Sequence, residues 1–183
     1  MTLRDRIAKD ESGVGLIELV IAIAVINIAV MAMFAMFQAG GLAILRAART
    51  SNASVVAEKQ MELYRGMLYV DIRLNDGLVG SADATHTAAS EWVSAATQKT
   101  SAACVNTSAS CKPVQTSVTG PDGRAYRIDT YIVDATPTSG RLGKSVTVKV
   151  SLASNPSSVL AKLNGNFDLA TGCIFGNTTG YGC

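Results

Sequence analysis

The stretch that decides the fold lies at residues 13–37 and reads GVGLIELVIAIAVINIAVMAMFAMF. After its first glycine, Glu18 and Asn27 are the only polar residues in a run of 24. About 20 consecutive apolar residues in a helix are enough to cross the hydrocarbon core of a bilayer. The sequence therefore predicts a transmembrane helix at residues 14–37.

A short charged leader, residues 1–13, precedes this helix and reads MTLRDRIAKDESG. Its three Lys and Arg residues favour a cytoplasmic N-terminus and an exported C-terminal part. A secretory signal peptide has an apolar stretch of roughly 7–15 residues that ends in a small-residue cleavage site. The run here is longer, so that interpretation fits poorly.

Residues 38–75 are predicted to continue the helix as an amphipathic segment, rich in Ala, Leu, Met, Gln, Glu and Arg. We expect one helix from about Leu16 to about Tyr69, which would be about 80 Å long at 1.5 Å per residue. Its weak points are Gly40-Gly41 and residues 50–52, where a kink or local melting is expected. The apolar residues that can share one face are Leu42, Leu45, Val55, Val56, Leu63, Met67 and Leu68.

The remaining residues, 76–183, are predicted to form an exported globular domain. Its first part, to about residue 118, is rich in Ala, Ser and Thr and reads as loop with one short helix at residues 90–96. Beyond it, AYRIDTYIVDA (125–135) and KSVTVKVSLA (144–153) alternate with period two, which predicts two half-buried antiparallel strands.

A turn sequence, Gly120-Pro121-Asp122-Gly123, precedes the first of these strands and would fold residues 115–119 back as a third, shorter strand. A small sheet needs its apolar face covered, and the helix is the obvious cover. The predicted class is α+β, with a long N-terminal helix packed on a small antiparallel sheet.

Four cysteines all fall beyond the apolar run, at positions 104, 111, 173 and 183. An even count in an exported domain indicates disulfides. Three connectivities are open, of which the pairing of nearest neighbours, Cys104 with Cys111 and Cys173 with Cys183, is only the simplest.

Bulk composition and residue types argue against several classes of function. A net charge of +2, from 16 Lys and Arg against 14 Asp and Glu, gives no sustained basic field for nucleic acid. His86 is the single histidine and no C-x-x-C pair occurs, so neither a metal site nor a catalytic set is expected. His86 itself is expected at the surface. We therefore expect no enzyme, no cofactor and no metal.

The segment from Gly13 to Leu19, with the apolar run behind it, closely resembles the class III leader of type IV prepilins and type II secretion pseudopilins. The shared pattern is a short charged leader ending in glycine, then an apolar residue, L-I-E-L and about 20 apolar positions. A weaker similarity lies at residues 58–69, EKQMELYRGMLY, where minor pilins and pseudopilins carry Q-x-E-x-x-R. The membrane-helix proline of many major pilins is missing here.

The resemblance implies a defined processing and assembly route. A prepilin peptidase would cut between Gly13 and Val14 and methylate the new amine of Val14. Glu18 would pair with that amine on a neighbouring subunit, because a carboxylate at the mouth of an apolar segment is expensive in lipid. A C-terminal disulfide-bounded loop, as in many pilins, would join Cys173 and Cys183. The partners implied are the peptidase, other pilin or pseudopilin subunits, the assembly machinery and the membrane.

The leading hypothesis is therefore a minor pilin or pseudopilin, first held as a single-pass protein in the inner or cytoplasmic membrane and then in a cell-surface or periplasmic filament. A main structural pilin of the same filament is the nearest alternative. A single-pass membrane-anchored extracellular binding domain and a secreted effector are the alternatives from other classes. Adhesion, motility, DNA uptake and secretion all use this N-terminal device, so the sequence leaves the machine open.

Overall fold

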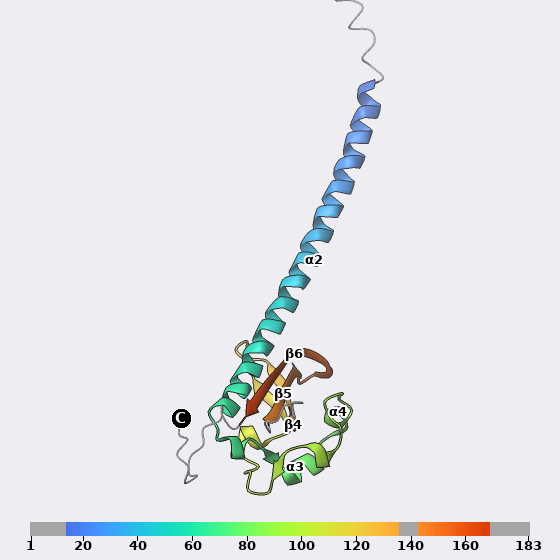
Figure 1. Cartoon of the computed structure of the whole chain (residues 1–183). Helices are drawn as coiled ribbons and strands as arrows, with labels where there is room; N and C mark the ends of the chain where they lie inside the picture. Colours follow the sequence, from blue (N-terminus) through green and yellow to red (C-terminus); the bar gives the residue numbers. More distant parts are fainter. Residues whose placement is uncertain (1–13, 136–142, 169–183) are drawn as a thin grey trace, which may run out of the picture. The chain divides into compact units, whose positions relative to one another are not determined.

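The computed structural model describes residues 14–135 and 143–168, except for the side chain of Val14 (Figure 1). Contacts divide the chain into two compact units, Met1–Ala47 and Ala48–Cys183. The elements in order are α2 (Val14–Arg65), η1 (Tyr69–Asp71), β1 (Leu74–Asn75), α3 (Asp76–Gly80), α4 (Ala84–Thr87), η2 (Ala95–Thr97), β2 (Thr100–Ser101), η3 (Ala109–Cys111), β3 (Val114–Thr119), β4 (Ala125–Ala135), β5 (Gly143–Leu152) and β6 (Asn155–Asp168).

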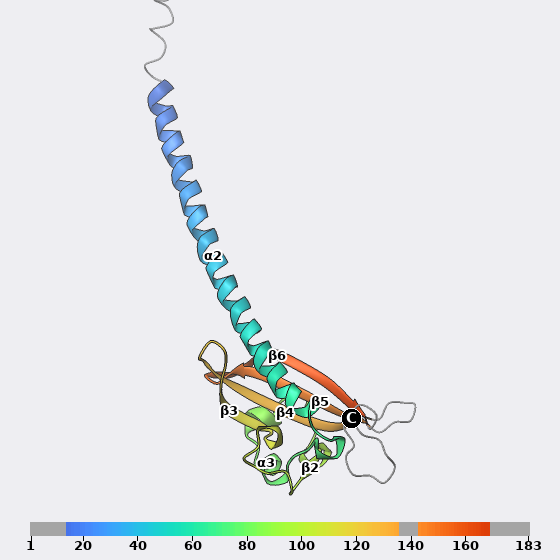
Figure 2. The same cartoon turned by 90° about the vertical axis from the view of Figure 1, so that its left-hand side faces the viewer.

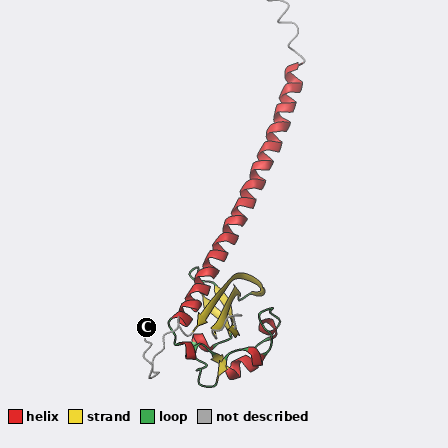
Figure 3. Ribbon diagram, in the orientation of Figure 1, coloured by secondary structure: helices red, strands yellow, loops and turns green. Residues whose placement is uncertain are grey.

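The α+β prediction is confirmed, because one long N-terminal helix packs through its C-terminal turns on a four-stranded antiparallel sheet (Figures 2 and 3). The helix is continuous through Gly40-Gly41 and through residues 50–52, so the expected local melting is wrong. In the second segment the hydroxyl of Ser54 donates to the carbonyl of Thr50 at 3.1 Å, four residues back, and so stays within the helix.

The face of α2 that packs on the sheet matches the predicted one only in part, since Val56 is buried and Met67 packs against the core as expected. Val55 and Leu63 are 47% and 41% exposed, whereas Ala53 and Ala57 are fully buried. Small residues let the helix backbone approach the sheet closely, and a count of large aliphatic residues misses that face. Its members are Ala53, Val56, Ala57, Gln60, Met61 and Tyr64.

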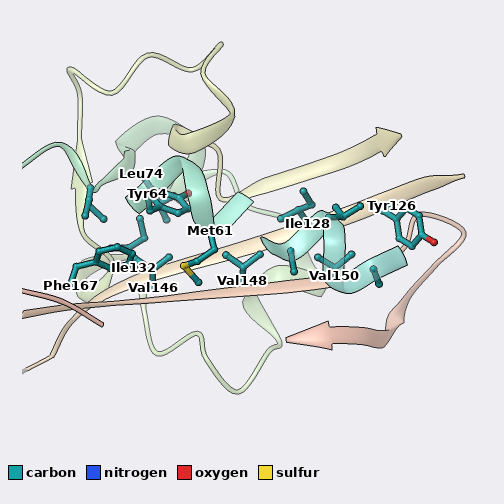
Figure 4. Close-up of a cluster of buried hydrophobic side chains, with 14 of the residues drawn as sticks. Met61, Tyr64, Leu74, Tyr126, Ile128, Ile132, Val146, Val148, Val150 and Phe167 are labelled. Carbon is teal, nitrogen blue, oxygen red and sulfur yellow. The ribbon is translucent and has the colours of Figure 1, made fainter. Parts of the chain in front are cut away.

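The sheet has the order β3-β4-β5-β6, with each neighbouring pair antiparallel. The predicted turn joins β3 to β4, and Gly123 adopts φ +72°, a conformation that favours glycine. Residues 125–135 form β4 as expected. Side chains of β4 and β5 pointing toward α2 form the centre of the core (Figure 4), namely Tyr126, Ile128, Ile132, Val146, Val148 and Val150.

The fourth strand, β6, has no counterpart in the sequence prediction. Its sequence, NPSSVLAKLNGNFD, contains residues typical of turns. The structure supplies a reason for one of them, since a Cβ added at Gly165 would lie 3.0 Å from the sulfur of Met61. Glycine at this position lets the strand pass beneath α2.

Both faces of β4 and β5 are covered, so the description of these strands as half-buried is wrong. Arg127, Asp129 and Tyr131 alternate with the core residues of β4, and each is at most 7% exposed. Residues 83–92, which include α4, lie over this second face (Figure 1). The domain therefore has three layers, with α2 on one side of the sheet and this segment on the other.

Candidate functional site

The N-terminal part of α2 presents apolar side chains on every side. All residues from Gly15 to Arg46 are exposed, including Ile17 at 62% and Phe34 at 64%. α2 is the one helix in the described part of the chain that is long and apolar enough to cross a membrane. Exposed apolar surface of this extent indicates a surrounding lipid phase or other protein surfaces.

Glu18 lies one turn into this exposed segment. Its carboxylate is exposed and pairs with no cation among the described residues. An acidic group near a helix N-terminus interacts favourably with the helix dipole, which is the ordinary explanation for such a residue. In a hydrocarbon environment that interaction alone would leave a charge without a counter-ion.

The other residues predicted for processing lie at or beyond the edge of the described chain. Gly13 lies outside it, and Val14 is the first residue of α2, with its side chain undescribed. Cys173 and Cys183 also lie outside the described residues. The cleavage site, the methylation site and the C-terminal loop therefore stay predictions.

A disulfide joins Cys104 to Cys111, the nearest-neighbour pairing, with 5.6 Å between their Cα atoms. The loop it closes presents two carbonyl groups to α2. Gln60 Nε2 donates to the carbonyl of Ala109 at 3.0 Å, and the hydroxyl of Tyr64 donates to that of Ser110 at 2.8 Å. Burial raises the pKa of Tyr64 to about 12. The disulfide loop thus fixes the C-terminal part of α2 at the edge of the core.

A polar cluster joins residues 83–92, which we call the outer segment, to the sheet, and all of its members except Asp83 are buried. The guanidinium of Arg127 donates to Asp83 at 2.7 and 2.8 Å and to Asp129 at 2.7 and 2.8 Å. His86 Nδ1 lies 3.0 Å from Asp129 Oδ1. An ionised carboxylate only accepts hydrogen bonds, so Nδ1 carries the proton in this contact. These residues form what we call the outer cluster: Asp83, His86, Arg127 and Asp129.

Charge pairing sets the ionisation of the two acids. Hydrogen bonds from Arg127 lower the pKa of Asp83 to about 2. Burial opposes ionisation of Asp129, but hydrogen bonds from His86 and Arg127 still lower its pKa below the usual value. Both carboxylates are therefore charged at neutral pH, and each is matched by a donor.

The prediction that His86 lies at the surface is wrong. Its ring is fully buried, stacks on Tyr131 with 4.3 Å between ring centroids and meets the edge of Trp92 at 5.3 Å. The hydroxyl of Tyr131 donates to the carbonyl of His86 at 3.0 Å. His86 Nε2 has no hydrogen-bond partner among the described residues. Asp129, 43 residues away in sequence, is the partner that the local sequence could not reveal.

A second ion cluster lies beside Trp92. Glu91 accepts from Lys149 at 2.9 Å and from Lys162 at 2.6 Å, which ties the outer segment to β5 and β6. Burial opposes ionisation of Glu91, but these two hydrogen bonds lower its pKa to about 2. The expected short helix at residues 90–96 is absent, since α4 ends at Thr87 and only the 3₁₀ turn η2 follows.

A groove of about 540 Å³ opens between the outer segment and β6. Its floor contains Asp129, Tyr131, Lys149 and Ser151, and Val159 of β6 lies on its far wall. The described residues contain no group of three or more His, Cys, Asp and Glu that could hold a metal ion. Asp129 and Lys149 are held in ion pairs, whereas the buried hydroxyl of Ser151 has no hydrogen-bond partner among the described residues.

Comparison with known proteins leaves the fold and the residues as the basis for assigning a function. No family model matches the chain, and neither a curated protein nor a solved structure matches it.

Proposed function

We propose that this chain is a filament subunit of the type IV pilin class, a minor pilin or pseudopilin, which is anchored in a membrane by α2 and then assembled through it. The observation that carries the proposal is the exposed apolar segment of α2 with a single carboxylate near its start. A membrane anchor accounts for the apolar surface, and assembly through the helix also accounts for Glu18.

The role of Glu18 follows from the cost of burying a charge. Cleavage before Val14 would create a positive amine about 6 Å along the helix axis from Glu18, at 1.5 Å per residue. Pairing Glu18 with the amine of a neighbouring subunit exchanges two desolvated charges for one ion pair. The pair would fix the axial alignment of neighbouring subunits and would add little to the stability of the filament.

The C-terminal turns of α2 have a different role from its exposed N-terminal turns. Met61 packs these turns on the sheet, and Gln60 and Tyr64 donate to carbonyls of the disulfide loop, so the last turns of α2 are part of the domain. The exposed apolar turns from Leu16 to Phe37 offer the surface that would pack against other copies. This arrangement suits a subunit that buries its helix in a filament core and displays its domain outside.

Intact-mass analysis of the chain co-expressed with a prepilin peptidase tests the proposal. We expect a mature protein that begins at Val14 and carries one added methyl group. A catalytically inactive peptidase serves as the control and should leave the chain starting at Met1. A chain that keeps Met1 with the active peptidase, or one that begins beyond Phe37, contradicts the proposal.

A membrane-anchored binding domain that never polymerises is the second candidate, and the groove between the outer segment and β6 favours it. Shearing of cells separates the two functions. A filament subunit appears in the sheared fraction, in small amount if it is a minor subunit and as the dominant component if it is the main pilin. An anchored domain remains with the cells.

A further inference from the structure

Asn27 lies near the middle of the apolar run. At 1.5 Å per residue it is about 20 Å from Val14 and about 15 Å from Phe37, so in a bilayer with a hydrocarbon core about 30 Å thick it lies near the midplane. Its side chain is exposed and makes no hydrogen bond with the described residues. An amide at this depth without a partner is costly, because lipid offers neither donor nor acceptor.

Asn27 and Glu18 point to opposite sides of α2. They are nine residues apart, and a helix turns by about 100° per residue, so their directions differ by about 180°. One neighbouring helix therefore cannot meet both groups. A contact that satisfies Glu18 leaves the amide of Asn27 in lipid.

A second copy of this chain is the partner that fits Asn27. All copies cross the membrane in the same direction, so every Asn27 lies at the same depth. The amide has two donors and one acceptor group, and two amides facing one another satisfy each other. Single polar residues of this kind are known to fix register between helices. We propose that two copies of the chain associate level with one another in the membrane through Asn27.

This level dimer differs from the contact proposed for the filament. Pairing of Glu18 with the amine of Val14 requires two copies displaced by about 6 Å along the helix axis. At that displacement one Asn27 meets Ile23 or Met31 of its neighbour instead of the second amide. The level dimer is therefore a state of the membrane pool, and its two helices shift past one another or separate on incorporation.

The inference rests on the membrane anchoring in the proposed function and is independent of cleavage and polymerisation. It can therefore be tested with the full, uncleaved chain in a host that lacks a prepilin peptidase. Carbonate extraction of the membranes reports insertion separately. An extractable chain would contradict anchoring, and the dimer with it, whereas an inserted chain that stays monomeric contradicts only the dimer.

Cysteine crosslinking shows which face of α2 forms the contact between the two copies. Phe34 lies within about 20° of Asn27 around the helix, and Val25 lies within about 20° of Glu18 on the other side. We would introduce Phe34→Cys and, as the matched control, Val25→Cys, and oxidise the membranes with copper phenanthroline. The unsubstituted chain measures how much covalent dimer the native cysteines form by themselves. We expect a covalent dimer from Phe34→Cys and near-background dimer from Val25→Cys.

Substitution of Asn27 in the Phe34→Cys chain then tests the amide itself. Interhelical hydrogen bonds measured in membrane proteins correspond to about a three- to twentyfold change in association. Asn27→Leu, which inserts more readily than the wild type, should lower the crosslinked fraction by about that factor, and Asn27→Gln should retain most of it. Equal crosslinking in the Asn27→Leu chain, or equal crosslinking from Val25→Cys, would overturn the proposal.

Discussion

The two parts of α2 belong to one continuous helix but have opposite surroundings. From Gly15 to Arg46 every residue is exposed, whereas in the last turns Ala53, Ala57 and Tyr64 are completely buried. The first part is apolar on every side as far as Phe37, apart from Glu18 and Asn27. The second part has one face of small and aromatic residues and an opposite face of charged ones. Helix formation and burial are thus specified separately, since the first buried residue in the described part of α2 is Ala53.

The largest effect is expected where the domain buries charge. Arg127→Ala leaves Asp129 buried without its guanidinium partner and should reduce the free energy of unfolding by about 3 to 5 kcal/mol. The matched control is Arg65→Ala, which removes an exposed pair with Glu62 and should cost less than about 1 kcal/mol. Urea unfolding of the full chain in detergent, followed by the fluorescence of Trp92, measures both. Similar losses in the two variants would contradict the account.

A pair of methionine substitutions tests the difference in burial between the two parts of α2. Met61 is 2% exposed and Met33 is 59% exposed on the same helix. Met61→Ala should reduce the free energy of unfolding of the domain by about 2 to 5 kcal/mol, because it leaves a cavity against β6. Met33→Ala should change it by no more than about 0.5 kcal/mol. The same urea titration tests both, and a Met33→Ala variant destabilised as much as Met61→Ala would contradict the account.

Removal of the disulfide tests how the C-terminal turns of α2 are held. The double variant Cys104→Ser with Cys111→Ser should lose about 2 to 3 kcal/mol, from the chain entropy of a loop this short. It should also increase amide hydrogen exchange at Gln60 and Tyr64, whose side chains bond the loop carbonyls. Unchanged exchange there, with α2 still protected, would refute the linkage between loop and helix.

The smallest of these effects is pH dependence from Glu91. Its pKa is about 2 in the folded state against 4.5 as the usual value, so the unfolded chain takes up the proton first as pH falls. The stabilisation from Glu91 is complete above about pH 5 and disappears as pH falls toward 2. Glu91→Gln should cost on the order of 1 to 2 kcal/mol at pH 7 after allowance for solvent screening. Stability curves of both proteins should converge near pH 2, and a constant gap would contradict the assignment.

The sequence predicted elements whose signals are local. The alternation in residues 125–135 marks β4, the turn at 120–123 marks its hairpin with β3, and the apolar run marks the start of α2. Each depends on neighbours within a few positions. The strand β6 was not predicted, because Gly165 is needed for close packing against Met61 and that contact is visible only in the three-dimensional structure.

The outer cluster could not be predicted for the same reason. Nothing near His86 in sequence suggests a buried ring, because Asp129 and Tyr131 come from a strand more than 40 residues later. One local signal was available, since Arg127, Asp129 and Tyr131 occupy alternate positions of β4 and so share the face away from the core. A face with both an arginine and an aspartate in the middle of a sheet suggests a second, polar covering layer.

The most direct test of the central claim is the incorporation of Glu18→Ala into filaments. The wild-type chain, Glu18→Ala and the conservative Glu18→Asp would be expressed with a complete type IV assembly machine and a prepilin peptidase, and the sheared and membrane fractions would be quantified. We expect wild type in sheared filaments, Glu18→Asp in reduced amount, and Glu18→Ala cleaved at Val14 but retained in the membrane. Equal incorporation of Glu18→Ala and wild type, or retention of the wild type in the membrane, would contradict the account.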